Sequence, residues 1–210
     1  MKHTPLLLTL AGIAMFSFGC GGGGGGNVPA CGAFSSCGGD IAGTWTFDGV
    51  CTEGDITSAM MDTSGLPPEC SDIIKSFSLN ISGTLTYANG TETSDMTLNM
   101  SVKVLYSSAC IGAEAGMPVT ATQSLCDTIS SSASSTDGPT MTCKLASGGC
   151  DCNMTMTESS QGSETYTVSG STLTYSDGDT LEFCVSGNNL TVRPQSDPGS
   201  PGMQFTLHRS

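Results

Sequence analysis

Residues 77–90 read FSLNISGTLTYANG, in which apolar and polar side chains alternate almost without a break. Successive side chains of a β-strand point to opposite faces, so this period of two predicts a strand with one buried face. Asn89 and Gly90 both tolerate the positive φ of a tight hairpin turn. Alternate apolar residues then continue from Met96 to Tyr106. We therefore expect a long antiparallel hairpin at the centre of a β-rich chain.

Shorter stretches of the same alternation lie on both sides of this hairpin. They start with Trp45 and Phe47 and end with Phe205 and Leu207, and glycine-containing turns separate those that follow residue 166. Two short helices interrupt the pattern, one beginning near Pro68 and one spanning residues 120–133, with Thr120 and Gln123 spaced as a capping box. Short strands with regular turns indicate a β-barrel or a β-sandwich. We expect an all-β domain with an up-and-down antiparallel barrel, and a sandwich as the alternative.

Gly43-Thr44-Trp45 resembles the Gly-x-Trp signature of lipocalins and of lipocalin-like bacterial lipoproteins, and residues 166–174 and 185–192 look like the closing hairpins of those domains. The resemblance covers about residues 41–209. It implies a lipocalin-like barrel in which Gly43 and Trp45 close one end. It also implies that an arginine from the last strands packs across the tryptophan as a cation–π contact, and Arg209 or Arg193 would supply it.

The first 19 residues have the pattern of an export signal. An apolar run of 13 residues, Leu6 to Phe18, follows a short positive start. It is too short for a membrane span, which needs about 20 apolar residues. Gly19-Cys20 resembles the lipobox of bacterial lipoproteins, which implies that Cys20 is lipidated and becomes the mature N-terminus. Ordinary secretion that leaves Cys20 as a thiol is the alternative.

This pattern divides the chain into three parts. Residues 1–19 are the expected signal peptide, residues 20–39 a lipidated tether and residues 40–210 the lipocalin-like domain. The tether contains six consecutive glycines from residue 21, and glycine loses the most backbone freedom on ordering. We expect a flexible connection between the membrane and the domain.

Ten of the eleven cysteines remain when Cys20 is set aside, so all can pair in an oxidising compartment. A hairpin with its loop at residues 146–149 would place Cys143 opposite Cys152, with Cβ atoms about 4.5–5.5 Å apart, which suits a disulfide. Closeness in sequence favours a second pair, Cys31 with Cys37. The pairing of the other six cysteines stays open.

The composition argues against several functions. Five basic and nineteen acidic residues follow Gly19, giving a net charge of −14 without any basic cluster, so we expect no nucleic-acid binding. The two histidines are His3 in the leader and His208 near the end, which leaves little for nucleophilic catalysis. The aspartates at 177 and 179 fit a hairpin turn better than a calcium site. We expect neither an enzyme nor a bound metal or cofactor.

The expected function follows from export, anchoring and fold together. We expect a lipoprotein held by its lipid at a bacterial membrane, the outer membrane by preference, whose barrel holds a small apolar ligand. The alternative is a non-catalytic structural or protein-interaction module of the cell envelope. A cavity within the barrel would favour the first function, and an interior filled by side chains would favour the second.

Overall fold

The computed structural model describes residues 28–54, 56, 66–134, 138–195 and 202–210. The predicted signal peptide, Cys20 and the glycine run lie outside the described residues. Within these ranges, the elements besides the strands are α3 (Ser108–Ala115), α4 (Gln123–Ala133) and the 3-10 turn η1 (Pro68–Cys70). The strands are β1 (Gly43–Glu53), β2 (Ile74–Ala88), β3 (Thr91–Ser107), β4 (Thr140–Ala146), β5 (Gly149–Ser169), β6 (Thr172–Tyr175), β7 (Thr180–Ser186), β8 (Asn189–Pro194) and β9 (Gly202–Arg209).

All nine strands belong to one antiparallel sheet, in the order β3-β2-β1-β9-β8-β7-β6-β5-β4. A further pairing of β3 with β5 closes eight of them into a ring and leaves β4 outside it. Strands that follow one another in the chain are neighbours around the ring, apart from β4. The predicted antiparallel β-rich fold is therefore confirmed. Of the two predicted helices, α4 is present, whereas the one expected near Pro68 is only the 3-10 turn η1.

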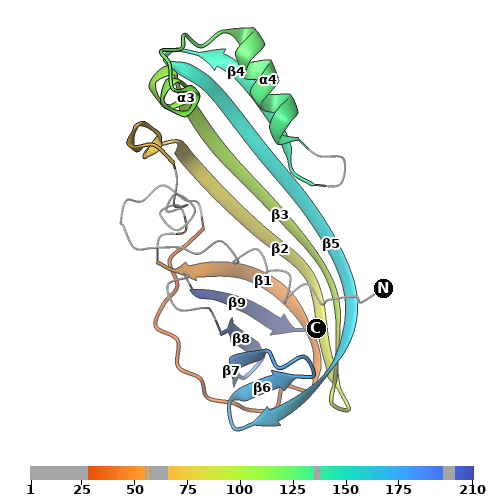
Figure 1. The fold of residues 1–210 in the computed structure, drawn as a ribbon. Coiled ribbons are helices and arrows are strands. Elements are labelled where there is room, and N and C mark those ends of the chain that lie inside the picture. Colours follow the sequence, from red (N-terminus) through yellow and green to blue (C-terminus); the bar gives the residue numbers. More distant parts are fainter. Residues whose placement is uncertain (1–27, 55, 57–65, 135–137, 196–201) are drawn as a thin grey trace.

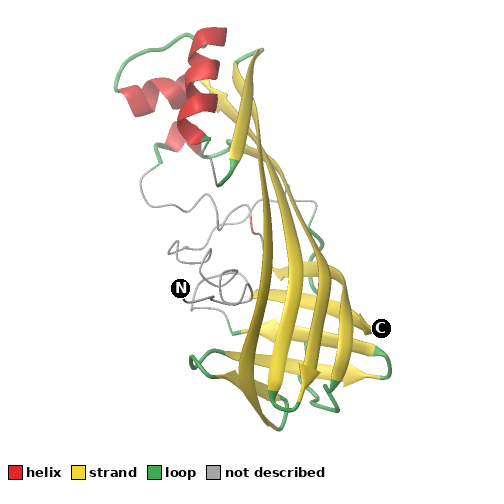
Figure 2. Cartoon of the chain, turned by 90° about the vertical axis from the view of Figure 1, so that its right-hand side faces the viewer, coloured by secondary structure: helices red, strands yellow, loops and turns green. Residues whose placement is uncertain are grey.

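Three strands are much longer than the rest: β2 has 15 residues, β3 has 17 and β5 has 21. They extend beyond the ring as a curved sheet, and Figures 1 and 2 show α3, α4 and β4 at its far end. The molecule thus has a ring end and a helical end, joined by three strands.

The predicted central hairpin is confirmed. Asn89 and Gly90 form its turn with φ values of 53° and 74°, and Ala88 pairs with Thr91. Gly83 occupies an inward position of β2, where a Cβ would lie only 2.1 Å from the carbonyl oxygen of Asp95. Only glycine fits this close approach of two backbones, which accounts for the one break in the apolar alternation.

Strand β5 is a single continuous strand, although the sequence pattern predicts two separate short strands, one at each end of this range. Its middle, residues 157–165, is polar on both faces, so it has no apolar period of two. Pairing with β3 holds this segment in place, from Thr91 opposite Thr165 to Ser107 opposite Gly149. The partner strand, rather than local pattern, determines this part of the fold.

The ring encloses a core of 17 buried residues. They are Ile41, Trp45, Phe47, Val50, Ile81, Leu85, Tyr87, Met96, Leu98, Leu173, Tyr175, Leu181, Phe183, Leu190, Val192, Phe205 and Leu207. A second, smaller core at the helical end contains four half-cystines together with Phe77 and Val102. Leu79 packs against both cores, so apolar contact is continuous along the curved sheet.

Helix α4 confirms the helix predicted over residues 120–133, but its N-cap is Thr122 rather than Thr120. The Thr122 hydroxyl accepts a hydrogen bond from the Leu125 N–H at 3.3 Å. Helix α3 was not predicted. It begins after Ser107, whose hydroxyl accepts from the Cys110 N–H at 3.0 Å, and ends at Gly116 with φ of 67°. Side-chain caps and a left-handed glycine therefore define this short helix.

The side chains of α4 and of the residue after it cover the outer edge of β4. The N–H of Cys143 donates to the Ser130 hydroxyl at 2.7 Å, and the N–H of Met141 donates to the Ser134 hydroxyl at 2.9 Å. The N–H of Leu145 donates to the Gln123 side-chain oxygen at 2.9 Å. Three backbone donors that would otherwise face solvent are thus paired, which protects the strand edge from pairing with another chain.

Candidate functional site

The structure brings together the three residues that the Gly-x-Trp resemblance implies. Trp45 is fully buried, and its indole N–H donates to the Ile41 carbonyl at 2.8 Å. Arg209 pairs with Trp45 across β1 and β9, and its guanidinium carbon lies 4.6 Å from the tryptophan ring centroid. The same guanidinium donates to the Asp40 carbonyl at 3.1 Å. Gly43, with φ of 129°, has open space where a Cβ would approach Arg209 no closer than 4.0 Å.

Arg193, the other arginine considered for this role, lies elsewhere on the ring. Its guanidinium carbon lies 4.8 Å from the Phe34 ring centroid, and the side chain forms ion pairs with Glu182 and Glu53. Glu53 also accepts a hydrogen bond from the Gln204 amide at 2.7 Å. Arg193 thus holds the N-terminal segment against the ring and has no part in the contact with Trp45.

Five disulfides pair all ten cysteines of the described residues: Cys31–Cys51, Cys37–Cys184, Cys70–Cys110, Cys126–Cys150 and Cys143–Cys152. The predicted Cys143–Cys152 bridge is present, and the two residues face each other in the β4–β5 register as expected.

The predicted pairing of Cys31 with Cys37 is wrong. The segment between them lies along the ring instead of turning back on itself, because Ala30 bridges to Thr52 and Gly38 bridges to Cys184. Each cysteine therefore meets a strand of the ring, and closeness in sequence does not bring the two together.

Residues 28–41, which we call the N-terminal arm, are fastened to the ring. The Cys31 N–H donates to the Thr52 carbonyl at 2.9 Å, and the Val185 N–H donates to the Gly38 carbonyl at 2.8 Å. Val28 is buried in the core at the helical end. The described part of the predicted tether, residues 28–39, therefore lies against the domain over its whole length.

A cluster of polar side chains lies inside the ring. Glu92 is 2% exposed and accepts a hydrogen bond from the Tyr175 hydroxyl. Tyr87, Glu92 and Glu164 stand in one row across β2, β3 and β5, and Ser94 stands in the next row. Three buried oxygens in this cluster have no hydrogen-bond partner: the Tyr87 hydroxyl, the Ser94 hydroxyl and one oxygen of the Glu164 carboxylate. Such groups are rare in folded proteins, because a buried polar atom without a hydrogen bond lowers the free energy of unfolding.

Burial shifts the titration of Glu92 and of two tyrosines in this cluster. Burial raises the pKa of Glu92 above the ordinary glutamate value, although the hydrogen bond from the Tyr175 hydroxyl opposes the shift. Burial also raises the pKa of both tyrosines, and the nearby Glu92 charge adds to the effect. The sequence contains a sign of this cluster. Glu92 and Ser94 precede Met96 by four and two residues in β3, so the three side chains lie on the same, inward face of the strand.

Metal-ligating groups do not gather in the parts of the chain that the structure places. His208 pairs with Asp48, with 2.7 Å between the imidazole Nδ1 and a carboxylate oxygen, at an exposed position. Nowhere in the described ranges do three or more histidine, cysteine, aspartate or glutamate side chains group as potential metal ligands. Within the same ranges, no helix is both long and apolar enough to cross a bilayer.

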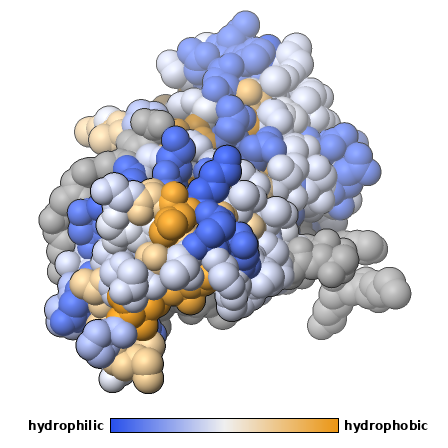
Figure 3. Space-filling view, turned by 90° about the horizontal axis from the view of Figure 1, so that it is seen from above, coloured by the Kyte–Doolittle hydropathy of each residue, from blue (hydrophilic) through white to orange (hydrophobic). Residues whose placement is uncertain are grey.

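The surface at the helical end is mainly hydrophilic or neutral, with small hydrophobic patches between (Figure 3). Among the described residues, the large apolar side chains that are exposed come from separate elements or loops: Leu66, Met117, Leu145 and Val168. Single exposed apolar residues of this kind are normal on a protein surface.

Comparison with known proteins gives no relative for this chain, because no family model, curated protein or solved structure matches it.

Proposed function

We propose that this chain is an exported bacterial lipoprotein, anchored through lipidated Cys20, whose lipocalin-like barrel acts as a non-catalytic structural or protein-interaction module of the cell envelope. The observation that carries the proposal is the ring core, in which 17 apolar side chains are buried and packed against one another. A carrier of small apolar ligands would need that space. The interior therefore favours interaction through the outer surface over ligand storage within.

The lipocalin-like assignment draws its support from one end of the ring. The ring has eight antiparallel strands, and Arg209 covers the buried Trp45 there. This is the arrangement that the resemblance of Gly43-Thr44-Trp45 to the family implies. The helical extension, β4 and the five disulfides are additions to that plan.

Cysteine pairing supports export and lipidation of Cys20. The five disulfides need an oxidising compartment, and they use every cysteine except Cys20. A thioether to lipid at Cys20 would leave no free thiol to exchange with these bridges. Several acyl chains on one residue are enough for stable membrane attachment.

The N-terminal arm suits an attachment point. Cys31–Cys51 links it to β1 and Cys37–Cys184 links it to β7, so a pull on residue 20 is passed to two strands of the ring. Among the described residues, Val28 joins the arm to the core at the helical end. We expect the curved sheet and its helices to contact other envelope components.

The proposal is tested in a bacterium that exports the full chain and is fed a labelled fatty acid. We expect label and membrane association for the wild type, both lost in Cys20→Ser, with all five disulfides retained in both proteins. A wild-type chain that is released without label would overturn lipid anchoring.

The absence of an internal ligand is tested separately. Organic extraction of the purified protein, followed by mass spectrometry, is expected to yield only the attached lipid, and lipophilic fluorophores are expected to stay dim. A stoichiometric extracted compound would instead favour the ligand carrier.

A further inference from the structure

One edge of β5 is paired at both ends but not in the middle. On this edge β4 pairs with residues 149–155, and β6 pairs with residues 166–169. Between them, residues 156–165 have no strand partner on this side among the described residues, while β3 pairs with them on the other side. We call this stretch the β5 gap. It is about 30 Å long at the rise of a β-strand, enough for a further strand of seven to nine residues.

The backbone groups that face the gap can be identified from their neighbours. The Tyr166 N–H donates to the Gly90 carbonyl, toward the β2–β3 hairpin, whereas the Thr165 carbonyl accepts from the Ser176 N–H beyond β6. Alternate residues of a strand direct their N–H and C=O groups to opposite edges. The odd-numbered residues therefore point into the gap: Thr157, Ser159, Gln161 and Ser163.

The edge of β4 shows how this chain protects an edge that is not to be paired. There, Gln123, Ser130 and Ser134 accept from three successive outward N–H groups. The β5 gap has no such cover among the described residues. An exposed edge of this kind is a template for an added strand.

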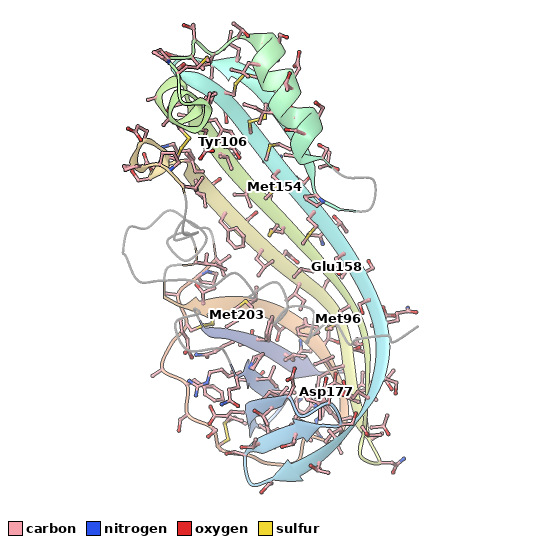
Figure 4. The ribbon with its side chains drawn as sticks, viewed as in Figure 1. Met96, Tyr106, Met154, Glu158, Asp177 and Met203 are labelled. Atoms are coloured by element: carbon pink, nitrogen blue, oxygen red, sulfur yellow. A yellow bond between two sulfur atoms is a disulfide. The ribbon has the colours of Figure 1, made fainter. Side chains whose placement is uncertain are left out.

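The side chains beside the gap indicate the chemistry of its occupant. Glu158 and Glu164 lie on the inward face of β5, and one oxygen of Glu164 is buried without a partner. Figure 4 places Glu158 midway along β5. Together with the net charge of −14 after Gly19, these carboxylates favour lysine or arginine on an incoming strand. A second copy of this chain would bring further acidic groups instead.

We infer that the β5 gap binds an extended, basic segment of a partner protein, which adds to the sheet as an antiparallel strand between β4 and β6. The inference rests on the proposed interaction role and identifies the surface that performs it. Backbone hydrogen bonds to residues 157–163 hold the segment. A lysine or arginine side chain directly across from Glu158 selects it, because opposite residues of paired strands lie about 5 Å apart. Glu164, which accepts a hydrogen bond from the Ser176 hydroxyl at 3.0 Å, adds negative charge at the end of the gap.

The test uses the full exported chain and a nine-residue peptide of alternating lysine and threonine. Amide hydrogen exchange, followed residue by residue, is expected to slow about tenfold at 90% occupancy for residues 157, 159, 161 and 163, since only free protein then exchanges. The amides of Ser160 and Gly162 already face β3 and are expected to stay unchanged. These serve as internal controls.

Two variants test the edge and the charge separately, and the first has a matched control. Gln161→Pro removes an outward N–H without removing a β3 hydrogen bond, and is expected to abolish binding, whereas Gln161→Ala binds normally. Glu158→Lys is expected to weaken binding about three- to tenfold, because one favourable exposed ion pair becomes a repulsion. Thermal unfolding checks that each variant is folded.

Three results would overturn the inference. They are unchanged exchange at millimolar peptide, equal binding of a peptide with glutamate in place of lysine, and protection that appears with protein concentration alone, which would indicate self-association. Lipid labelling at Cys20 and ligand extraction do not depend on any of these results, so failure here is distinct from failure of the proposed function.

Discussion

Removing the Cys37–Cys184 disulfide is expected to destabilise the protein more than removing Cys31–Cys51. Both bridges fasten the N-terminal arm to the ring, and none of the four cysteines is buried, so neither change leaves a core cavity. The two bridges differ in sequence separation, which is 147 residues for the first and 20 for the second. They therefore form a matched pair for the effect of loop length.

The magnitude follows from the chain entropy that each bridge removes from the unfolded state. The bridges Cys70–Cys110 and Cys126–Cys150 already bypass 40 and 24 residues of the longer loop, which leaves about 83 of its 147. A loop of that length corresponds to about 4.5 kcal/mol, and a loop of 20 residues to about 3.3 kcal/mol. We expect the double variant C37A/C184A to be less stable than C31A/C51A by about 1 kcal/mol.

The assay is guanidinium unfolding of the oxidised proteins, followed by the fluorescence of Trp45, which is the one tryptophan and is fully buried. Midpoints and slopes together give the free energy of unfolding for each variant. Equal losses, or a larger loss for C31A/C51A, would refute the view that these bridges act by constraining the unfolded chain.

Three further predictions concern single residues. Because burial raises the pKa of Glu92, the folded chain keeps a proton that the unfolded chain has lost at the same pH. The free energy of unfolding of the wild type should therefore fall as the pH rises above the ordinary glutamate pKa, by at most about 1.4 kcal/mol per pH unit. Glu92→Gln should remove that fall, which thermal melts at several pH values would measure. Ser130→Ala should cost about 1–3 kcal/mol in denaturant unfolding by leaving the Cys143 N–H unpaired, whereas Ser132→Ala, which loses only a contact within α4, should cost less. Arg209→Ala should cost about 0.5–2 kcal/mol and shift the tryptophan emission, since the guanidinium no longer covers the ring; unchanged emission would contradict this.

Local patterns in the sequence were enough to predict the parts of the fold that depend on neighbours in the chain. The β2–β3 hairpin follows from alternation and from Asn89-Gly90. The Cys143–Cys152 bridge follows from a short turn that fixes the register between β4 and β5. Trp45 and Arg209 were placed together through a family resemblance rather than through local pattern.

The rest of the fold depends on long-range pairing, which leaves no local signal. The polar middle of β5 becomes a strand because β3 lies beside it, and this pairing also closes the ring. Cys37 meets Cys184 across 147 residues for a similar reason, since the ring brings β7 to the arm. Hydrophobic periodicity reports which residues are buried but not which strands are neighbours.

The candidate site shows the same limit. Glu92 has the parity of an inward residue, but this parity does not reveal Tyr175 as its hydrogen-bond partner. Tyr175 lies on β6, which comes near β3 only because β5 pairs with both strands. The β5 gap also depends on topology, since it exists only where β4 ends and β6 begins along one edge.

Mass spectrometry of the mature protein, before and after reduction, reports the lipid on Cys20 and the number of disulfides in one experiment. We expect an N-terminus at Cys20 carrying diacylglycerol, and a gain of ten hydrogens on reduction, two for each of five disulfides. An unmodified thiol at Cys20, an N-terminus elsewhere or a smaller gain on reduction would contradict a lipid-anchored, fully disulfide-bonded module.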